Sequence, residues 1–376
     1  MICIWILHFN LNTGRGNGFI LTSMTEGVIK VLIVEDSLVN QNLLKGLILS
    51  DSRFKLVGIA NNGRQAIEFV SLYSPDVVSM DIHMPVMDGV EATMNIMQKT
   101  PVPIVIVSSF YQTSEVELAI KVLDAGAVTI LPKPFGPGHP KFAQSSRQYL
   151  NMLKAMSEVK VVRRKNTDGF KIPPPSLSGY PAPKAMQGSR EFKVLVIGAS
   201  AGGPEGIRTI LTGLPPDFSL PVLIVQHIDA NFAEGFCSWL NTFSKLPVHI
   251  AVNGEPFLPG NVYLPPGDRH LSVRSEGVIA VINEGPIKGL RPAVAILFQS
   301  AAKVYGKNLI AVLLSGMGKD GAAELKTLYE IGAHTIVQSE QSCLVFGMPG
   351  EAVKLGAASK IMSPTDMIKE ITDLIK

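Results

Sequence analysis

Short runs of apolar residues alternate along the chain with longer segments whose apolar residues recur every three or four positions. Short runs rich in Val, Ile and Leu, bounded by Gly, Pro or acidic residues, predict buried β-strands, and the longer spacing predicts amphipathic helices. The alternation occurs in two separate regions. Repeated strand–helix units favour a parallel sheet covered by helices on both faces. The pattern therefore predicts an α/β protein with two domains, each built on a mostly parallel sheet.

The first region is predicted to form five strand–helix units. Its expected strands are 30–34, 54–60, 76–80, 103–107 and 128–131, and its expected helices are 37–50, 63–73, 88–98, 115–125 and 141–156. Sites in open parallel sheets form at the carboxyl ends of the strands, where the strand order reverses. With the strand order 2-1-3-4-5, the ends of the first and third strands become neighbours at that point.

Polar residues follow these predicted strands. Glu35 and Asp36 end the first strand and Asp81 ends the third, while Ser108 and Lys133 end the fourth and fifth. Three neighbouring carboxylates repel one another unless a cation joins them, and hard oxygen ligands favour Mg²⁺. The set can accept a phosphoryl group, with Asp81 attacking and Ser108 and Lys133 binding phosphoryl oxygens. Taken singly, the acidic pair could only cap the following helix and the lysine could be a surface charge.

Together these motifs resemble the response-regulator receiver domain over residues 29–157. The resemblance is carried by Val34-Glu35-Asp36-Ser37, Met80-Asp81-Ile82-His83-Met84-Pro85, Val107-Ser108-Ser109 and Lys133-Pro134. It implies a five-stranded, flavodoxin-like parallel fold in which Asp81 is the phosphoacceptor and a histidine kinase is the phosphoryl donor. It further implies that Glu35, Asp36 and Asp81 bind Mg²⁺ together with the backbone carbonyl of His83, whose imidazole is expected to be exposed.

Two segments are predicted to lie outside the domains. Residues 158–191 combine the basic trio Arg163-Arg164-Lys165 with clustered prolines and have no apolar period, which is typical of a semi-rigid linker. Such a linker would let the first domain cover the second or move away from it. Residues 1–28 are expected to be a disordered extension, or to lie mostly ahead of the true translation start, because Met24 comes just before the first convincing strand.

The second region, residues 192–376, opens with an apolar strand that runs into the pattern Gly198-x-Ser200-x-Gly202. A serine flanked by small residues between a strand and a helix is typical of a nucleophile, because the tight turn exposes the hydroxyl and leaves amides free for an oxyanion. A structural turn or a phosphate cradle at the helix N-terminus is the alternative interpretation.

Two further strand ends supply possible partners for that serine. His227 follows the strand 220–226, and Asp320 lies in a Gly-rich turn after the strand 308–314. A serine, a histidine and an aspartate at one edge of a sheet can act as nucleophile, base and orienting carboxylate. Amides around Gly316-Met317-Gly318 are candidate oxyanion donors. Alternatively, the histidine is only a polar strand end and the aspartate only a helix cap.

Other histidines compete with His227 for the role of base. His249 and His334 are expected to open strands, and His270 to lie in a loop, which makes His270 the strongest rival. The chain order serine, histidine, aspartate differs from the order in α/β-hydrolases, so that family is disfavoured.

A second resemblance bears on the choice. Residues 192–376 resemble the catalytic domain of chemotaxis protein-glutamate methylesterases. The motifs that carry this resemblance are Gly198–Pro204, Gln226-His227, Pro266–Leu271, Arg291-Pro292, Ser315–Gly321 and Val345–Pro349. It implies Ser200, His227 and Asp320 as the triad, the Met317 amide as an oxyanion donor, and no cofactor in this domain. The implied reactions are hydrolysis of glutamate γ-methyl esters and deamidation of glutamines on chemoreceptors, for chemotaxis adaptation.

Five positions depart from that family pattern, two of them Ile228 and Asp229, which replace a Met-Pro after the histidine. Ala201 replaces a threonine after the serine, and Ala293 and Ala295 replace a serine and an aspartate. The changes could alter rate, receptor choice or deamidation. They leave two other readings open: an esterase with a substrate outside chemotaxis, and a domain that serves only as a docking platform.

Composition limits the class of protein and the cellular compartment that can be expected. Of the 376 residues, 46% are hydrophobic and 17% charged, which excludes disorder throughout. A formal charge of +3 without a long basic run does not suggest nucleic-acid binding. Three widely spaced cysteines suit a reducing compartment, so a cytoplasmic protein is expected. No apolar run approaches the roughly 18 residues of a membrane span, so no membrane insertion is expected.

Overall fold

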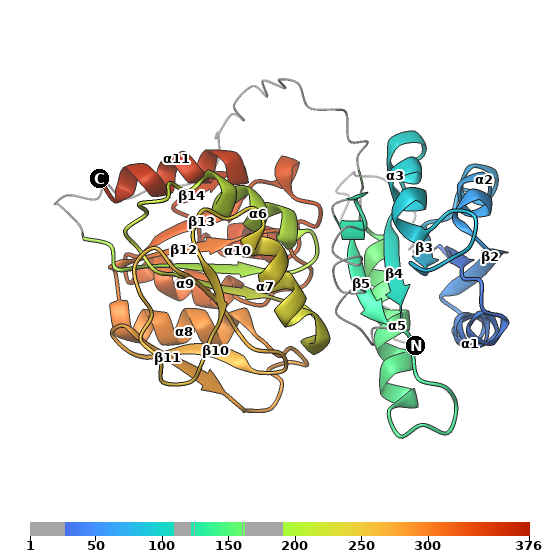
Figure 1. Ribbon diagram of the computed structural model, residues 1–376, viewed down its shortest axis with the longest axis horizontal. Helices are drawn as coiled ribbons and strands as arrows, with labels where there is room; N and C mark the ends of the chain where they lie inside the picture. Colours follow the sequence, from blue (N-terminus) through green and yellow to red (C-terminus); the bar gives the residue numbers. More distant parts are fainter. Residues whose placement is uncertain (1–26, 109–121, 124, 160, 162–190) are drawn as a thin grey trace, which may run out of the picture.

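The computed structural model of the chain describes residues 27–108, 122–123, 125–159, 161 and 191–376, which form two α/β domains lying side by side (Figure 1). Nearly all of the predicted helix 115–125 lies outside the described residues. So do almost all of the predicted extension 1–28 and most of the predicted linker 158–191.

The N-terminal domain contains a five-stranded sheet in which all strands are parallel. The predicted order 2-1-3-4-5 is confirmed. The strands are β1 (Ile29–Val34), β2 (Phe54–Ala60), β3 (Val77–Met80), β4 (Ile104–Ser108) and β5 (Thr129–Pro132). The helices among the described residues are α1 (Leu38–Leu49), α2 (Gly63–Tyr73), α3 (Gly89–Lys99) and α5 (Phe142–Ser157).

Strand β1 shows why this sheet is covered on both faces. Successive side chains of a strand point to opposite faces. Leu32 and Val34 pack in one hydrophobic cluster, and Val31 and Ile33 pack in another. A continuous apolar run is therefore buried on both sides, as expected for a central parallel strand.

The C-terminal domain is built on a seven-stranded sheet in the order β14-β13-β12-β6-β7-β9-β8, and every pairing is parallel. Its strands are β6 (Val194–Ala199), β7 (Val222–Gln226), β8 (Val248–Ile250), β9 (Val262–Leu264), β12 (Leu309–Leu313), β13 (His334–Gln338) and β14 (Lys360–Met362). A separate antiparallel hairpin joins β10 (His270–Ser275) to β11 (Val278–Ile282).

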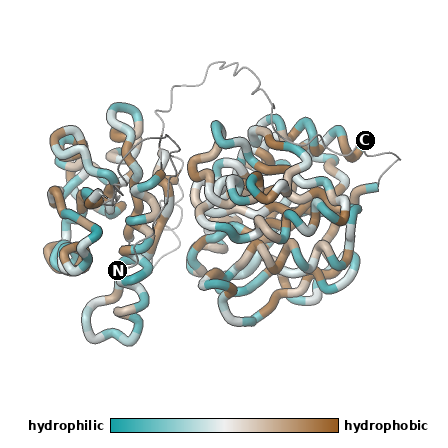
Figure 2. The backbone as a smooth tube through the Cα atoms, turned by 180° about the vertical axis from the view of Figure 1, so that it is seen from behind, coloured by the Kyte–Doolittle hydropathy of each residue, from teal (hydrophilic) through white to brown (hydrophobic). Residues whose placement is uncertain are grey.

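Helices pack on both faces of this sheet (Figure 1). They are α6 (Gly203–Gly213), α7 (Ala233–Asn241), α8 (Val294–Tyr305), α9 (Ala322–Glu330), α10 (Met348–Lys354) and α11 (Pro364–Leu374). Hydrophobic segments run through the interior of both domains (Figure 2). None of the helices that the structure describes is long and apolar enough to cross a bilayer.

Strand β6 marks the topological switch point of the larger sheet. From β6 the chain moves to β7 on one side, and later strands begin with β12 on the other side. A crevice forms where successive connections leave in opposite directions, outside the carboxyl ends of the strands. The turns after β6, β7 and β12 therefore meet at one edge.

Candidate active site

Ser200 lies directly after β6, in the turn that leads into α6. Its N–H donates to the carbonyl oxygen of Ser315 (3.0 Å), and its carbonyl accepts from the N–H of Gly203 (2.8 Å). Gly202 has a φ of +75°, and a Cβ at that position would lie 2.5 Å from the Cβ of Leu344. A side chain would therefore be strained and would clash. Glycine is therefore required at position 202 for the turn that presents the Ser200 hydroxyl.

His227 and Asp320 form a hydrogen bond at the same edge of the sheet. The His227 Nε2 atom lies 2.8 Å from Oδ2 of Asp320, and both side chains are largely buried. The carboxylate also accepts from the amides of Val294 (2.6 Å) and Ala295 (3.1 Å), the first two residues of α8. A helix N-terminus carries free amides and partial positive charge, which favours an anion there.

These contacts keep Asp320 ionised. Burial opposes the charge, but the hydrogen bond and attraction from His227, together with the amides of Val294 and Ala295, outweigh it and lower the pKa of Asp320. A charged Asp320 fixes the His227 ring and can stabilise its cation. Because Nε2 faces Asp320, Nδ1 is the nitrogen available to act as a base.

Ser200 and His227 come from neighbouring strands. The His227 amide donates to the carbonyl of Ala199 (2.9 Å), and Ala199 pairs with Gln226 across the two strands. Within the described part of the chain, no hydrogen bond joins Ser200 Oγ to His227. Hydrogen bonds of catalytic groups are often long or poorly aligned before substrate binds, so the lack of this bond is compatible with a nucleophile and its base.

The turn after β12 lies against Ser200. A Cβ on Gly316 would lie 2.8 Å from the Cβ of Ser200, so the two turns are in contact. The Gly316 amide is used by the carbonyl of Val345 (3.1 Å), whereas no hydrogen bond from the Met317 amide occurs among the described residues. Met317 is 41% exposed. Because no described residue accepts from its amide, the Met317 N–H can donate to an oxyanion.

Two polar side chains to which the sequence assigned no role of their own, Gln226 and Ser315, hold these turns together. Gln226 Nε2 donates to the carbonyls of Ser200 (2.9 Å) and His227 (3.0 Å). Ser315 Oγ donates to the Ala201 carbonyl (2.8 Å) and accepts from the Val345 amide (2.9 Å). Both residues are polar positions at the ends of apolar strand runs, which is the signal that could have revealed them.

The rival histidines do not reach Ser200 or Asp320. His249 is exposed and bonded to Asn261 (2.8 Å), and His334 begins β13 at the opposite edge of the sheet. His270 is not in a loop as expected: it opens β10 and is fully buried. The hairpin β10–β11, to which His270 belongs, is absent from the predicted elements.

The five polar residues predicted at strand ends of the N-terminal domain also gather at one edge. Carboxylate oxygens of Glu35, Asp36 and Asp81 all lie within 4.8 Å of one another. Lys133 Nζ lies 2.7 Å from Asp81 Oδ2 and 2.8 Å from Glu35 Oε2. Ser108 is buried at the end of β4. Three converging carboxylates beside one lysine fit a Mg²⁺ ion, and the His83 side chain is exposed, as predicted.

The charges in this cluster are strongly coupled. Burial, reinforced by the charge of Asp81, raises the pKa of Glu35 although the hydrogen bond from Lys133 opposes the change. Burial disfavours the charge on Lys133, but attraction and hydrogen bonds from Asp81 and Glu35 prevail and raise its pKa. Lys133 therefore stays an ammonium, and Glu35 binds protons more readily than an ordinary glutamate.

That raised pKa predicts a pH dependence for Mg²⁺ binding. A carboxylate must be deprotonated to bind a metal, so a change from neutral to mildly acidic pH should weaken Mg²⁺ affinity, because Glu35 becomes protonated at a higher pH than an ordinary glutamate. Isothermal titration calorimetry on the full chain measures this. Glu35→Gln should bind Mg²⁺ more weakly and with a smaller pH effect, whereas Glu68→Gln, an exposed control on α2, should match the wild type. Equal wild-type affinity at both pH values would contradict the assignment.

Comparison with protein families matches both domains. Residues 31–143 match the response regulator receiver domain, and residues 195–371 match the CheB methylesterase family. Both regions contain the edge of the sheet at which the polar residues converge.

Curated relatives match nearly the whole chain. A protein-glutamate methylesterase/protein-glutamine glutaminase of Geobacter metallireducens is 46% identical over 92% of this chain and 99% of its own length. A protein of the same name from Nitrosospira multiformis is 42% identical over 93% and 97%. Among solved structures, the Thermotoga maritima CheB methylesterase catalytic domain is 34% identical and covers 49% of this chain and 99% of its own, with a TM-score of 0.47.

Proposed function

The chain belongs to the CheB methylesterase family and carries a response regulator receiver domain, and from this premise we propose that it is a phosphorylation-activated serine esterase. Its substrates are glutamate γ-methyl esters on chemoreceptors, and it also deamidates glutamines there. The observation that carries the proposal is the His227–Asp320 hydrogen bond beside Ser200 at the switch point of the sheet. We place the protein in the cytoplasm, in line with its scattered cysteines.

In the proposed reaction, His227 Nδ1 takes the proton of Ser200 as the hydroxyl oxygen attacks the ester carbonyl carbon. The oxyanion of the tetrahedral intermediate accepts a hydrogen bond from the Met317 amide. His227 then protonates the departing methoxy oxygen and methanol leaves. Water, deprotonated by His227, attacks the acyl-enzyme, and the glutamate and free Ser200 are restored. With a glutamine substrate the leaving group is ammonia.

The receiver domain supplies the proposed control. Asp81 attacks the phosphoryl group that a histidine kinase carries, Lys133 pairs with a phosphoryl oxygen, and the Ser108 hydroxyl binds another. Glu35, Asp36, Asp81 and the His83 carbonyl would hold Mg²⁺, which neutralises charge on the transferred group when bound. The three converging carboxylates and the lysine beside them support this assignment.

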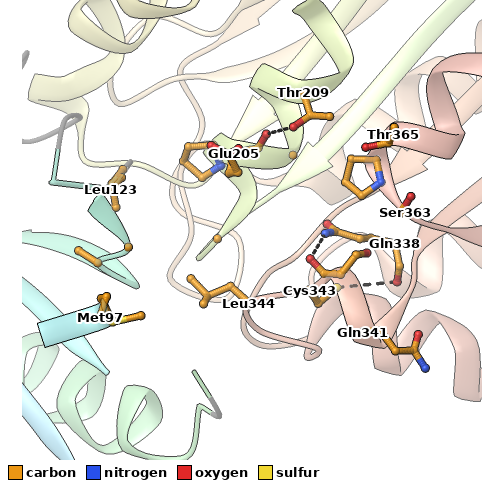
Figure 3. Close-up of a pocket in the computed structure, with 17 residues that line it drawn as sticks. Met97, Leu123, Glu205, Thr209, Gln338, Gln341, Cys343, Leu344, Ser363 and Thr365 are labelled. Carbon is orange, nitrogen blue, oxygen red and sulfur yellow. Dashed lines mark hydrogen bonds between the residues drawn. The ribbon is translucent and has the colours of Figure 1, made fainter. Parts of the chain in front are cut away.

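A cavity between the domains supports masking of the catalytic site. It has a volume of about 310 Å³ and lies between α3 of the receiver domain and the turn that follows Ser200 (Figure 3). Its walls include Met97, Leu123, Gly126, Ala127, Gly202 and Leu344. We infer that the unphosphorylated receiver domain restricts access to Ser200, and that phosphorylation of Asp81 rearranges the interface around Ser108.

Masking predicts distinct effects of two changes. Deleting residues 1–190 should raise basal methanol release, since residues 191–376 contain the whole seven-stranded sheet without the receiver domain. Asp81→Asn should leave basal release intact and abolish its stimulation by a small phosphodonor such as acetyl phosphate. The assay is release of labelled methanol from methylated receptor. An unchanged rate after truncation would disprove masking.

The substrate is tested by comparing esters. The proposal predicts methanol release from methylated chemoreceptor at a rate that unrelated methyl esters do not reach. An esterase acting outside chemotaxis would show the reverse preference. If the domain serves only as a docking platform, the wild type should release methanol no faster than Ser200→Ala. The alanines at positions 201, 293 and 295 are the only support for that alternative.

A further inference from the structure

His270 is a buried titratable residue that the proposed reaction does not use. Its side chain is 0% exposed, at the start of β10. Its Nδ1 receives the N–H of Ala293 (3.1 Å), and its Nε2 lies 3.2 Å from the carbonyl oxygen of Gly285. A fully buried ring cannot touch a substrate, so His270 can affect the reaction only through the residues that it contacts.

The two partners define one protonation state of the ring. A backbone N–H can only donate and a carbonyl can only accept, so Nδ1 must be unprotonated and Nε2 must carry the proton. His270 is therefore a neutral imidazole in a single tautomer, with both nitrogens used.

These contacts close a segment that leads directly to Asp320. Gly285 lies near the start of residues 283–293, which join β11 to α8, and Ala293 lies at their end. Arg291 reinforces the closure: Nε donates to Asp268 Oδ1 (2.7 Å) and a terminal nitrogen donates to the Glu284 carbonyl (2.9 Å). These hydrogen bonds therefore hold both ends of residues 283–293 against residues 268–270.

The residue after Ala293 begins α8, and the first two amides of that helix hold the carboxylate of Asp320. Any displacement of Ala293 therefore moves the donors that orient Asp320 and, through its 2.8 Å hydrogen bond, His227. We propose that His270 is a positioning residue that sets the orientation of Asp320 through the N-terminus of α8. The inference rests on the proposed function, because this orientation matters only if Asp320 acts on His227.

Three substitutions separate the two hydrogen bonds of the ring. His270→Asn keeps an acceptor near the place of Nδ1, His270→Gln keeps a donor near the place of Nε2, and His270→Leu keeps neither. The readouts are the rate at which a fluorophosphonate labels Ser200, which needs no receptor, and kcat and KM for methanol release. Each variant's unfolding midpoint is measured beside them.

We expect His270→Leu and His270→Gln to lower the labelling rate and kcat by about ten- to hundredfold, with KM nearly unchanged, because a displaced orienting group acts on the chemical step. His270→Asn should recover most of the lost rate, since it alone retains the acceptor for Ala293. The control His249→Asn, at an exposed histidine, should match the wild type.

Two results would overturn the inference. One is a His270→Leu protein that is labelled as fast as the wild type. The other is a set of three variants whose rates follow only their unfolding midpoints, with His270→Asn no better than His270→Gln. If wild-type Ser200 is labelled but no methanol is released from receptor, the proposed substrate is wrong while the labelling rates still decide the role of His270. If wild-type Ser200 is not labelled at all, both proposals fail.

Discussion

Replacing Ser200 by alanine is expected to lower kcat for methanol release from methylated receptor by about 10⁶-fold. The reason is that only the Ser200 oxygen can form the acyl-enzyme: the His227–Asp320 pair cannot replace the missing nucleophile. The change removes one oxygen from a half-buried turn whose backbone bonds remain, so the free energy of unfolding should change by no more than about 0.5 kcal/mol.

Ser238→Ala is the matched control for that measurement, because Ser238 is exposed on α7 of the same domain. It should release methanol at the wild-type rate. A Ser200→Ala protein that is folded and still turns over at more than a small fraction of the wild-type rate would show that another group attacks the ester.

The second large effect is expected for Asp320→Asn, which should lower kcat by about 10⁴-fold. The carboxylate accepts hydrogen bonds from the His227 ring and from two α8 amides. An amide has one acceptor oxygen where the carboxylate has two, and its NH₂ group cannot accept from either an amide N–H or the ring. His227 would lose the partner that fixes its tautomer and stabilises its cation.

The measurement is kcat and KM over a range of pH, with Asp217→Asn as a control at an exposed aspartate of the same domain. KM should stay close to the wild-type value, because Asp320 stabilises charge that appears only during the reaction. An Asp320→Asn enzyme that retains most of the wild-type kcat would exclude Asp320 from the reaction and leave His227 without its proposed partner.

Much of the fold could be predicted because the ends of apolar runs are visible in the sequence. In parallel sheets the carboxyl ends of the strands meet at one edge, so the polar residues that follow the runs indicate where a site forms. Asp81 and Lys133 come together in this way, at 2.7 Å, and so do His227 and Asp320. The order 2-1-3-4-5, which that reasoning took as its condition, is the order that the receiver sheet has.

The residues that support the triad could not be predicted. The amides of Val294 and Ala295 reach Asp320 from a helix whose position depends on packing across the whole domain. The hairpin β10–β11 was missed although Val278–Ile282 is an apolar, mostly β-branched run, so His270 was expected in a loop and considered as a base. Side-chain bonds to distant backbone atoms depend on tertiary packing, which local periodicity does not encode.

The cavity between the domains is a further feature that local sequence does not reveal. Met97 lies at the end of α3 and Leu344 in the loop before α10, and nothing in their surroundings in the chain pairs them. The same holds for the backbone contact of Ser200 with Ser315, since it depends on β12 lying beside β6 and not beside the strands that precede it in sequence.

The central claim, covalent catalysis by Ser200, is tested most directly by trapping the acyl-enzyme. A methylated receptor peptide is mixed with excess wild-type protein, the reaction is quenched in acid within the first turnover, and the protein is digested for mass spectrometry. The account predicts that the tryptic peptide containing Ser200 gains the mass of the receptor peptide less methanol. Methanol release without any adduct, or an adduct on another residue that persists in Ser200→Ala, would contradict it.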